Sequence, residues 1–130
     1  MAREDFRFEE THGVAAGDTE GFREYVRGSG AELSVTQGVY AETRSGWISD
    51  RTAHYLACGR PAVVQETGIP ARSRPEAGLL TFSEPADAAV AIEAVAGSYA
   101  VHSDAARRYA ERTFDSDRVL TKMLEATMVE

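Results

Sequence analysis

The chain has 130 residues, of which 43% are apolar and 27% charged, so it is long enough to bury the core of a single domain. Its net charge of −7, from 21 acidic and 14 basic residues, argues against a general nucleic-acid surface, which needs clustered lysine and arginine. No uncharged apolar stretch is long enough to span a membrane, and the charged start lacks the apolar segment of a signal peptide. We therefore expect a cytoplasmic protein that binds neither nucleic acid nor membranes.

The start of the chain is predicted to form an N-terminal arm or edge strand over residues 1–17, because Phe6 and Phe8 alternate with charged residues. The rest, residues 18–130, is predicted to form a single domain. Asp18 has the position of a helix N-cap, and Gly28 ends the helix that follows.

A strand–helix–strand unit is predicted in the middle of the chain. The first strand covers residues 31–35, and residues 36–46 are expected to form a loop. Ser49 is expected to cap a helix that ends at Gly59, and a strand over residues 61–65 follows. Because a helix connects them, the two strands should be parallel.

The C-terminal part is predicted to contain a third strand over residues 78–82 and then mainly helices. Ser83 is expected to cap a helix whose apolar face comprises Ala88, Ala89, Ile92, Val95 and Ala96. Two further helices are expected, the last capped by Asp115 or Ser116. The predicted fold class is α/β: a truncated Rossmann-like three-layer unit with a short, mostly parallel sheet of three or four strands and C-terminal helices.

The segment that leads into the central helix has the parts of an anion site. In open α/β sheets, ligands bind beyond the carboxyl ends of the strands, and a helix start offers free N–H groups to phosphate. Ser45, Ser49 and Thr52 add hydroxyls, and Gly46 allows close backbone approach. The candidate diphosphate-binding residues are Arg44, Ser45, Gly46, Trp47, Ser49, Asp50 and Arg51. In the alternative interpretation, the segment is an ordinary capped helix start with Trp47 in the core and Arg51 paired with Asp50 or another nearby carboxylate.

A second candidate segment, Glu66, Thr67 and Gly68, follows the strand at residues 61–65. A carboxylate at such a strand end can accept hydrogen bonds from two hydroxyls of a ribose or hexose. The alternative is a solvent-facing turn carboxylate.

Other chemistry has less support. Cys58 is the only cysteine and is expected to be a small buried residue, and a couple with His54 would lack a third group to orient it. The three histidines share no metal-ligand spacing, so we expect neither a metal nor a cofactor. No catalytic residue can be assigned from these patterns.

The sequence of residues 45–68, SGWISDRTAHYLACGRPAVVQETG, resembles the C-terminal, nucleotide-sugar-binding half of bacterial GT-B glycosyltransferases. The resemblance extends over about residues 18–124. It implies that residues 45–51 lie near the donor diphosphate, and that Glu66, Thr67 and Gly68 lie near the donor sugar or ribose. Two positions depart from the pattern: His54 and roughly Gly46 stand where many retaining members have glutamate, so their ribose contact does not carry over.

The resemblance implies a domain that binds a nucleotide-sugar or nucleotide diphosphate and lacks glycosyl transfer of its own, because the sequence contains no counterpart of the acceptor domain. It also implies that the strand at residues 31–35 has an open edge, which would pair with a second copy or with a larger glycosyltransferase-like partner. The main alternative is a non-catalytic binding or regulatory partner in a biosynthetic pathway. A small hydrolase or thiol enzyme is the least favoured.

Overall fold

The computed structural model describes residues 17–128, so the predicted arm, apart from Gly17, lies outside the described residues. The first half contains α2 (Thr19–Gly28), β1 (Glu32–Ser34), α3 (Gly38–Glu42), α4 (Asp50–Ala57) and β2 (Ala62–Gln65). The second half contains a 3₁₀ turn (Ala71–Ser73), β3 (Leu79–Phe82), α5 (Pro85–Gly97), α6 (Tyr99–Thr113) and α7 (Ser116–Thr127).

The three strands form one parallel sheet in the order β1-β2-β3, with Glu32 beside Ala62 and Ala62 beside Leu79. All three predicted strands are therefore confirmed, together with the parallel direction, the α/β class and the C-terminal helices. Within the described sheet β1 is an edge strand, since it pairs only with β2.

Several predicted helix ends are confirmed. The Asp18 carboxylate accepts a hydrogen bond from the Gly21 N–H at 2.6 Å, and the Ser49 hydroxyl oxygen accepts one from the Arg51 N–H at 3.2 Å. After α4, Gly59 has a φ of +68°, the left-handed conformation that ends a helix.

Two predicted details are wrong. The expected loop over residues 36–46 contains α3, a five-residue helix too short to show a periodic pattern in the sequence. The N-cap of α5 is Glu84 rather than Ser83, because the Asp87 carboxylate accepts hydrogen bonds from the N–H groups of both residues and fixes the helix start one residue later.

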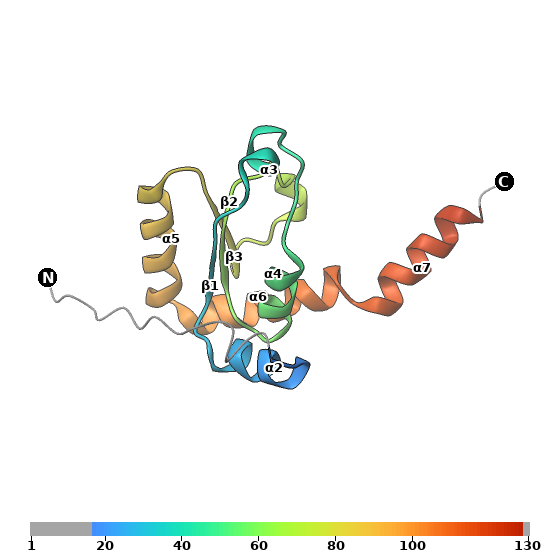
Figure 1. The fold of residues 1–130 in the computed structure, drawn as a ribbon, viewed down its shortest axis with the longest axis horizontal. Helices are drawn as coiled ribbons and strands as arrows, with labels where there is room; N and C mark the ends of the chain where they lie inside the picture. Colours follow the sequence, from blue (N-terminus) through green and yellow to red (C-terminus); the bar gives the residue numbers. More distant parts are fainter. Residues whose placement is uncertain (1–16, 129–130) are drawn as a thin grey trace, which may run out of the picture.

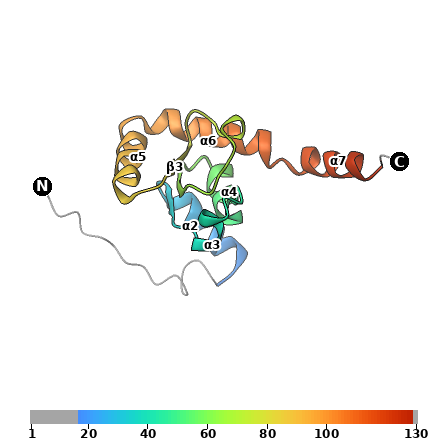
Figure 2. The ribbon, with the colours of Figure 1, turned by 90° about the horizontal axis from the view of Figure 1, so that it is seen from above.

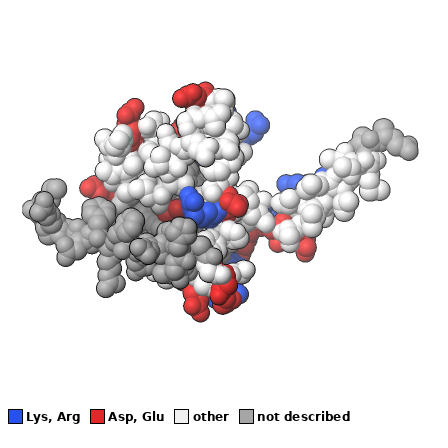
Figure 3. Space-filling view, viewed as in Figure 1, with Lys and Arg blue, Asp and Glu red and all other residues white. Residues whose placement is uncertain are grey.

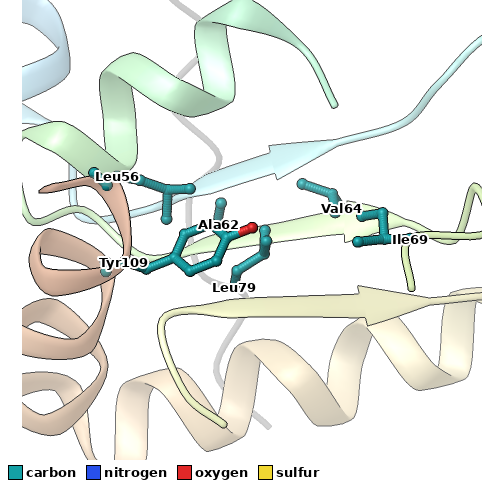
Figure 4. Close-up of a cluster of buried hydrophobic side chains, with 8 residues drawn as sticks. Leu56, Ala62, Val64, Ile69, Leu79 and Tyr109 are labelled. Atoms are coloured by element: carbon teal, nitrogen blue, oxygen red, sulfur yellow. The ribbon is translucent and has the colours of Figure 1, made fainter. Parts of the chain in front are cut away.

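The core consists of two clusters that share the central strand. Ala62 and Val64 of β2 pack with Leu56 of α4 and Tyr109 of α6 (Figure 4). Val63, between them, belongs to the second cluster, which contains buried residues of β3 and α5. Because successive side chains of a strand point to opposite faces, α4 and α6 pack against one face of β2 and α5 against the other (Figure 1).

The predicted apolar face of α5 is only partly correct. Ala88 and Val95 are buried as expected, but Ala91 is the third buried residue of the helix. Ala89, Ile92 and Ala96 are exposed. Alanine, valine and isoleucine occur all round this helix, so its sequence has no polar side that would fix the buried one.

The last helix, α7, extends away from the rest of the protein (Figures 1 and 2) and has no buried residue. Its apolar stripe is exposed, with exposed fractions of 55% for Leu120 and 62% for Leu124. Among the described helices, none is long and apolar enough to cross a membrane.

Candidate functional site

The structure brings the two predicted site segments together beyond the carboxyl ends of β1 and β2. The Gly46 N–H donates a hydrogen bond to the Thr67 carbonyl at 2.7 Å. The Thr67 hydroxyl, almost fully buried, donates in turn to the Trp47 carbonyl at 2.8 Å. Two hydrogen bonds therefore hold the loop before α4 against the turn after β2.

Gly68 provides a second close approach between these segments. Its φ is +89°, and a Cβ added there would lie 2.8 Å from the Arg44 carbonyl oxygen. Arg44 itself has a φ of 50°, which is uncommon for a residue with a side chain. Only glycine at position 68 allows this backbone contact without displacement.

Trp47 forms an aromatic pair with Tyr40, which α3 supplies. The two rings are stacked, with centroids 4.5 Å apart and planes within 6° of parallel. Trp47 keeps 38% of its surface exposed, so the alternative that placed it in the core is wrong. No sequence pattern marks Tyr40, because α3 is too short to show a periodicity that would pair its ring with Trp47.

The start of α4 already has side-chain acceptors. The Arg51 N–H donates to the Asp50 carboxylate at 2.8 Å as well as to Ser49. Ser45 also makes only local contacts, accepting a hydrogen bond from the Trp47 N–H at 3.3 Å. Arg44 is exposed and makes no ion pair with the described residues.

The Arg51 side chain reaches β1. Its Nε donates to the Glu32 carboxylate at 2.7 Å and its Nη2 donates to the Ser34 hydroxyl at 3.1 Å. The Glu32 side chain is only 4% exposed, and its second oxygen, Oε2, has no partner among the described residues. The alternative that paired Arg51 with a nearby carboxylate thus describes this conformation, with Glu32 as the carboxylate.

The Glu66 carboxylate is fixed by Gly68 and Arg74. Its Oε1 accepts a hydrogen bond from the Gly68 N–H at 2.6 Å, and its Oε2 forms an ion pair with Arg74 at 2.8 Å. Arg74 also donates to the Thr81 hydroxyl of β3 at 2.9 Å. With 18% of its side chain exposed, Glu66 is not the solvent-facing turn carboxylate of the alternative interpretation.

These neighbours keep Glu66 ionised. Burial by itself raises the pKa of this carboxyl group, but the hydrogen bonds from Gly68 and Thr81 and the charge of Arg74 outweigh it and lower the pKa below its ordinary 4.5. The carboxylate is therefore ionised and held in place at neutral pH, and most of its lone pairs already accept from protein donors. Arg74 was missed because no local motif marks it.

The other candidates stay apart from this site. Cys58 is partly exposed rather than buried, and the His54 ring packs edge-on against Phe22 at 5.5 Å. His102 is buried and its Nδ1 accepts a hydrogen bond from the Gly78 N–H, which is a structural contact. Within residues 17–128, no three histidine, cysteine, aspartate or glutamate residues gather in a way that could hold a metal ion.

The comparisons with models of known families, with curated proteins and with solved structures find no match to this chain. The site contains a positioned carboxylate, Glu66, an exposed aromatic ring, Trp47, and an exposed arginine, Arg44, that forms no ion pair with the described residues. On the face shown in Figure 3, basic side chains form small separate groups among acidic ones.

Proposed function

We propose that this protein is a glycosyltransferase-like domain of the GT-B type, with a Rossmann-like three-layer arrangement, that binds a nucleotide-sugar or nucleotide diphosphate. The observation that carries the proposal is the pair of hydrogen bonds linking Gly46, Thr67 and Trp47, which join the proposed diphosphate and sugar segments into one site. Its location beyond the carboxyl ends of parallel strands is where α/β sheets bind such ligands.

Individual residues have separate roles in this proposal. Glu66 accepts a hydrogen bond from a sugar or ribose hydroxyl, in exchange for one of its present protein donors. Arg44, exposed at the rim, pairs with the diphosphate. Arg51 has half of its side chain exposed and holds β1 through Glu32, so it contributes to the diphosphate site by positioning the start of α4.

The proposed activity is donor binding, and we propose that a second copy or a larger glycosyltransferase-like partner supplies the acceptor surface. The edge position of β1 supports such a partner. Near this edge, Leu33 is 54% exposed and Val35 is 72% exposed.

A thermal-shift screen with nucleoside diphosphates and nucleotide-sugars tests donor binding. A ligand at about 100 times its Kd stabilises the folded state by about 2.7 kcal/mol, so the melting temperature of the wild type should rise. Glu66→Gln and Arg44→Gln should reduce this rise, each measured against its own ligand-free protein. Arg118→Gln, on α7, removes the same charge away from the site and should leave the rise unchanged. The absence of a shift with every nucleotide would reject the proposal.

The second candidate function is that of a non-catalytic binding or regulatory partner. It is favoured by the intramolecular contacts of Arg51 and Glu66, which already have protein partners where a donor site needs free groups. This function predicts no nucleotide-dependent shift, together with specific co-purification of a protein from the same biosynthetic pathway.

A further inference from the structure

A narrow cavity lies between the carboxyl ends of β1 and β2 and the start of α4. Its volume is about 10 Å³, which is the space that one water molecule requires. Apolar atoms, among them those of Trp47, Ile48 and Val64, make up most of its lining surface, but six of the nine lining residues carry polar side chains, namely Ser34, Thr36, Ser49, Thr52, Gln65 and Thr67. Such a cavity holds a water only where polar atoms without other partners are available to it.

The Thr52 hydroxyl is the feature that indicates an occupant. Thr52 is 0% exposed, and its Oγ1 has no hydrogen-bond partner among the described residues. Nearly all buried polar side-chain atoms in folded proteins have a partner, because an unpaired one loses its bonds to water on folding. Thr52 lines the cavity, so a molecule there would supply the missing partner.

We propose that this cavity holds one ordered water molecule bonded to Thr52 Oγ1. The neighbouring hydroxyls have the capacity to complete its bonds. Ser34 accepts from Arg51, so its own proton remains available as a donor, and Thr67 donates to the Trp47 carbonyl, so its oxygen remains available as an acceptor. A water bonded to Thr52, Ser34 and Thr67 would make three hydrogen bonds, the usual number for buried water.

The charges around the cavity favour a neutral occupant over an anion. The positive end of α4 would attract an anion, but the Asp50 carboxylate already accepts from the Arg51 N–H at 2.8 Å. The same carboxylate also accepts from the Ser49 hydroxyl at 3.2 Å. No cationic side chain lines the cavity itself, so an anion inside it would lack a counter-charge, whereas the proposed diphosphate lies outside the cavity, at Arg44.

The water would connect three elements, with Ser34 contributed by β1, Thr67 by the turn after β2 and Thr52 by α4. It would thereby link β1 and α4 to the turn that contacts Gly46. This inference rests on the burial of Thr52 and is independent of nucleotide binding, so the failure of one leaves the other intact.

Thr52→Val tests the proposal through the sign of its effect on stability. If the water is present, valine removes one of its partners and should lower the melting temperature by roughly 5 °C. If the cavity is dry, valine removes only an unpaired hydroxyl, and the melting temperature should stay unchanged or rise, which would overturn the proposal. Thr67→Val, which loses the bond to Trp47, is the reference for a destabilising loss of a hydroxyl in the same region.

A high-resolution crystal structure of the whole chain gives the direct test. A solvent peak within hydrogen-bond distance of Thr52 Oγ1 is expected, including in crystals grown without halides. An empty cavity would overturn the proposal. Crystals soaked in bromide distinguish a water molecule from an anion. An anomalous bromide peak in the cavity would show an anion site and would also overturn the proposal.

Discussion

The Arg51 guanidinium and the Glu32 carboxylate form a 2.7 Å ion pair that joins the start of α4 to the edge strand β1. The two partners differ in exposure, since Arg51 is half exposed whereas the Glu32 side chain is only 4% exposed. The pair therefore compensates a charge that is mostly removed from water, and the same arginine orients the Ser34 hydroxyl.

Arg51→Gln should destabilise the protein, because it leaves the buried Glu32 carboxylate without its counter-charge. We expect a loss of about 1–3 kcal/mol in the free energy of unfolding, below the value for a fully buried pair because solvent screens the exposed arginine. Urea unfolding at pH 7 measures it. The double variant Glu32→Gln with Arg51→Gln should lose less than the sum of the single losses, and strictly additive losses would contradict the coupling.

The lowered pKa of Glu66 predicts a stability contribution that depends on pH. A carboxyl group with a depressed folded-state pKa stabilises the fold above its ordinary value of 4.5, and this contribution is lost as the pH falls through the folded-state pKa. Glu66→Gln should therefore be less stable than the wild type at pH 7, and the difference should shrink below about pH 4.5. Melting temperatures of both proteins between pH 3 and 7 measure this, with Glu125→Gln on α7 as a control. A difference independent of pH would contradict it.

Gly68→Ala should separate the loop before α4 from the turn after β2. The added Cβ would lie 2.8 Å from the Arg44 carbonyl, and the φ of +89° is strained for alanine. We expect a loss of about 2 kcal/mol or more in unfolding free energy. Gly28→Ala is the matched control, because a Cβ there meets nothing within 4 Å. Chemical denaturation measures both losses. Equal losses for the two substitutions would show that the close contact between Gly68 and Arg44 does not contribute to the free energy of unfolding.

Leu33→Pro should weaken any association through the edge of β1. The Glu32 N–H bonds to the Pro61 carbonyl next to β2, so the N–H of Leu33 points to the open edge. Proline removes this outward donor while keeping the bonds to β2. Light scattering at tens of micromolar should show a dimer for the wild type and a monomer for the variant. A wild-type monomer would reject pairing between copies, and Leu33→Ala controls for the loss of the side chain.

Removal of α7 should have little effect on the stability of the core. The helix has no buried residue, so a chain that ends at Asp115 keeps every residue of both core clusters. We expect its melting temperature to lie within a few degrees of the wild type and its urea m-value to fall only slightly. Tyr109→Ala, which truncates a core residue, should cost about 3–5 kcal/mol. A comparable loss from the truncation would show that α7 packs on the protein in solution.

The sheet and the long helices could be predicted because their signals are local. Asp18 and Ser49 mark helix starts, Gly59 marks a helix end, two short apolar runs correspond to β2 and β3, and an alternating segment corresponds to β1. The α5 face could not be predicted from an almost wholly apolar helix, and α3 is too short for periodicity.

The site could be predicted as a location and not as a set of contacts. Strand ends and a helix start indicated the two segments, and the structure shows that they meet. Their side-chain partners come from other elements of the fold, such as Glu32 of β1 for Arg51 and Thr81 of β3 for Arg74. No local pattern specifies such pairs, because they depend on how the strands are placed beside each other.

The strand order has a consequence for how the chain can fold during synthesis. In the sheet that residues 17–128 form, each strand pairs with the strand next to it in sequence, and β3 does not insert between β1 and β2. The sheet can therefore grow in one direction as the chain leaves the ribosome, with β1 and β2 pairing before β3 emerges. Because the partners are close in sequence, the entropy of loop closure stays small and folding should be fast for a parallel sheet.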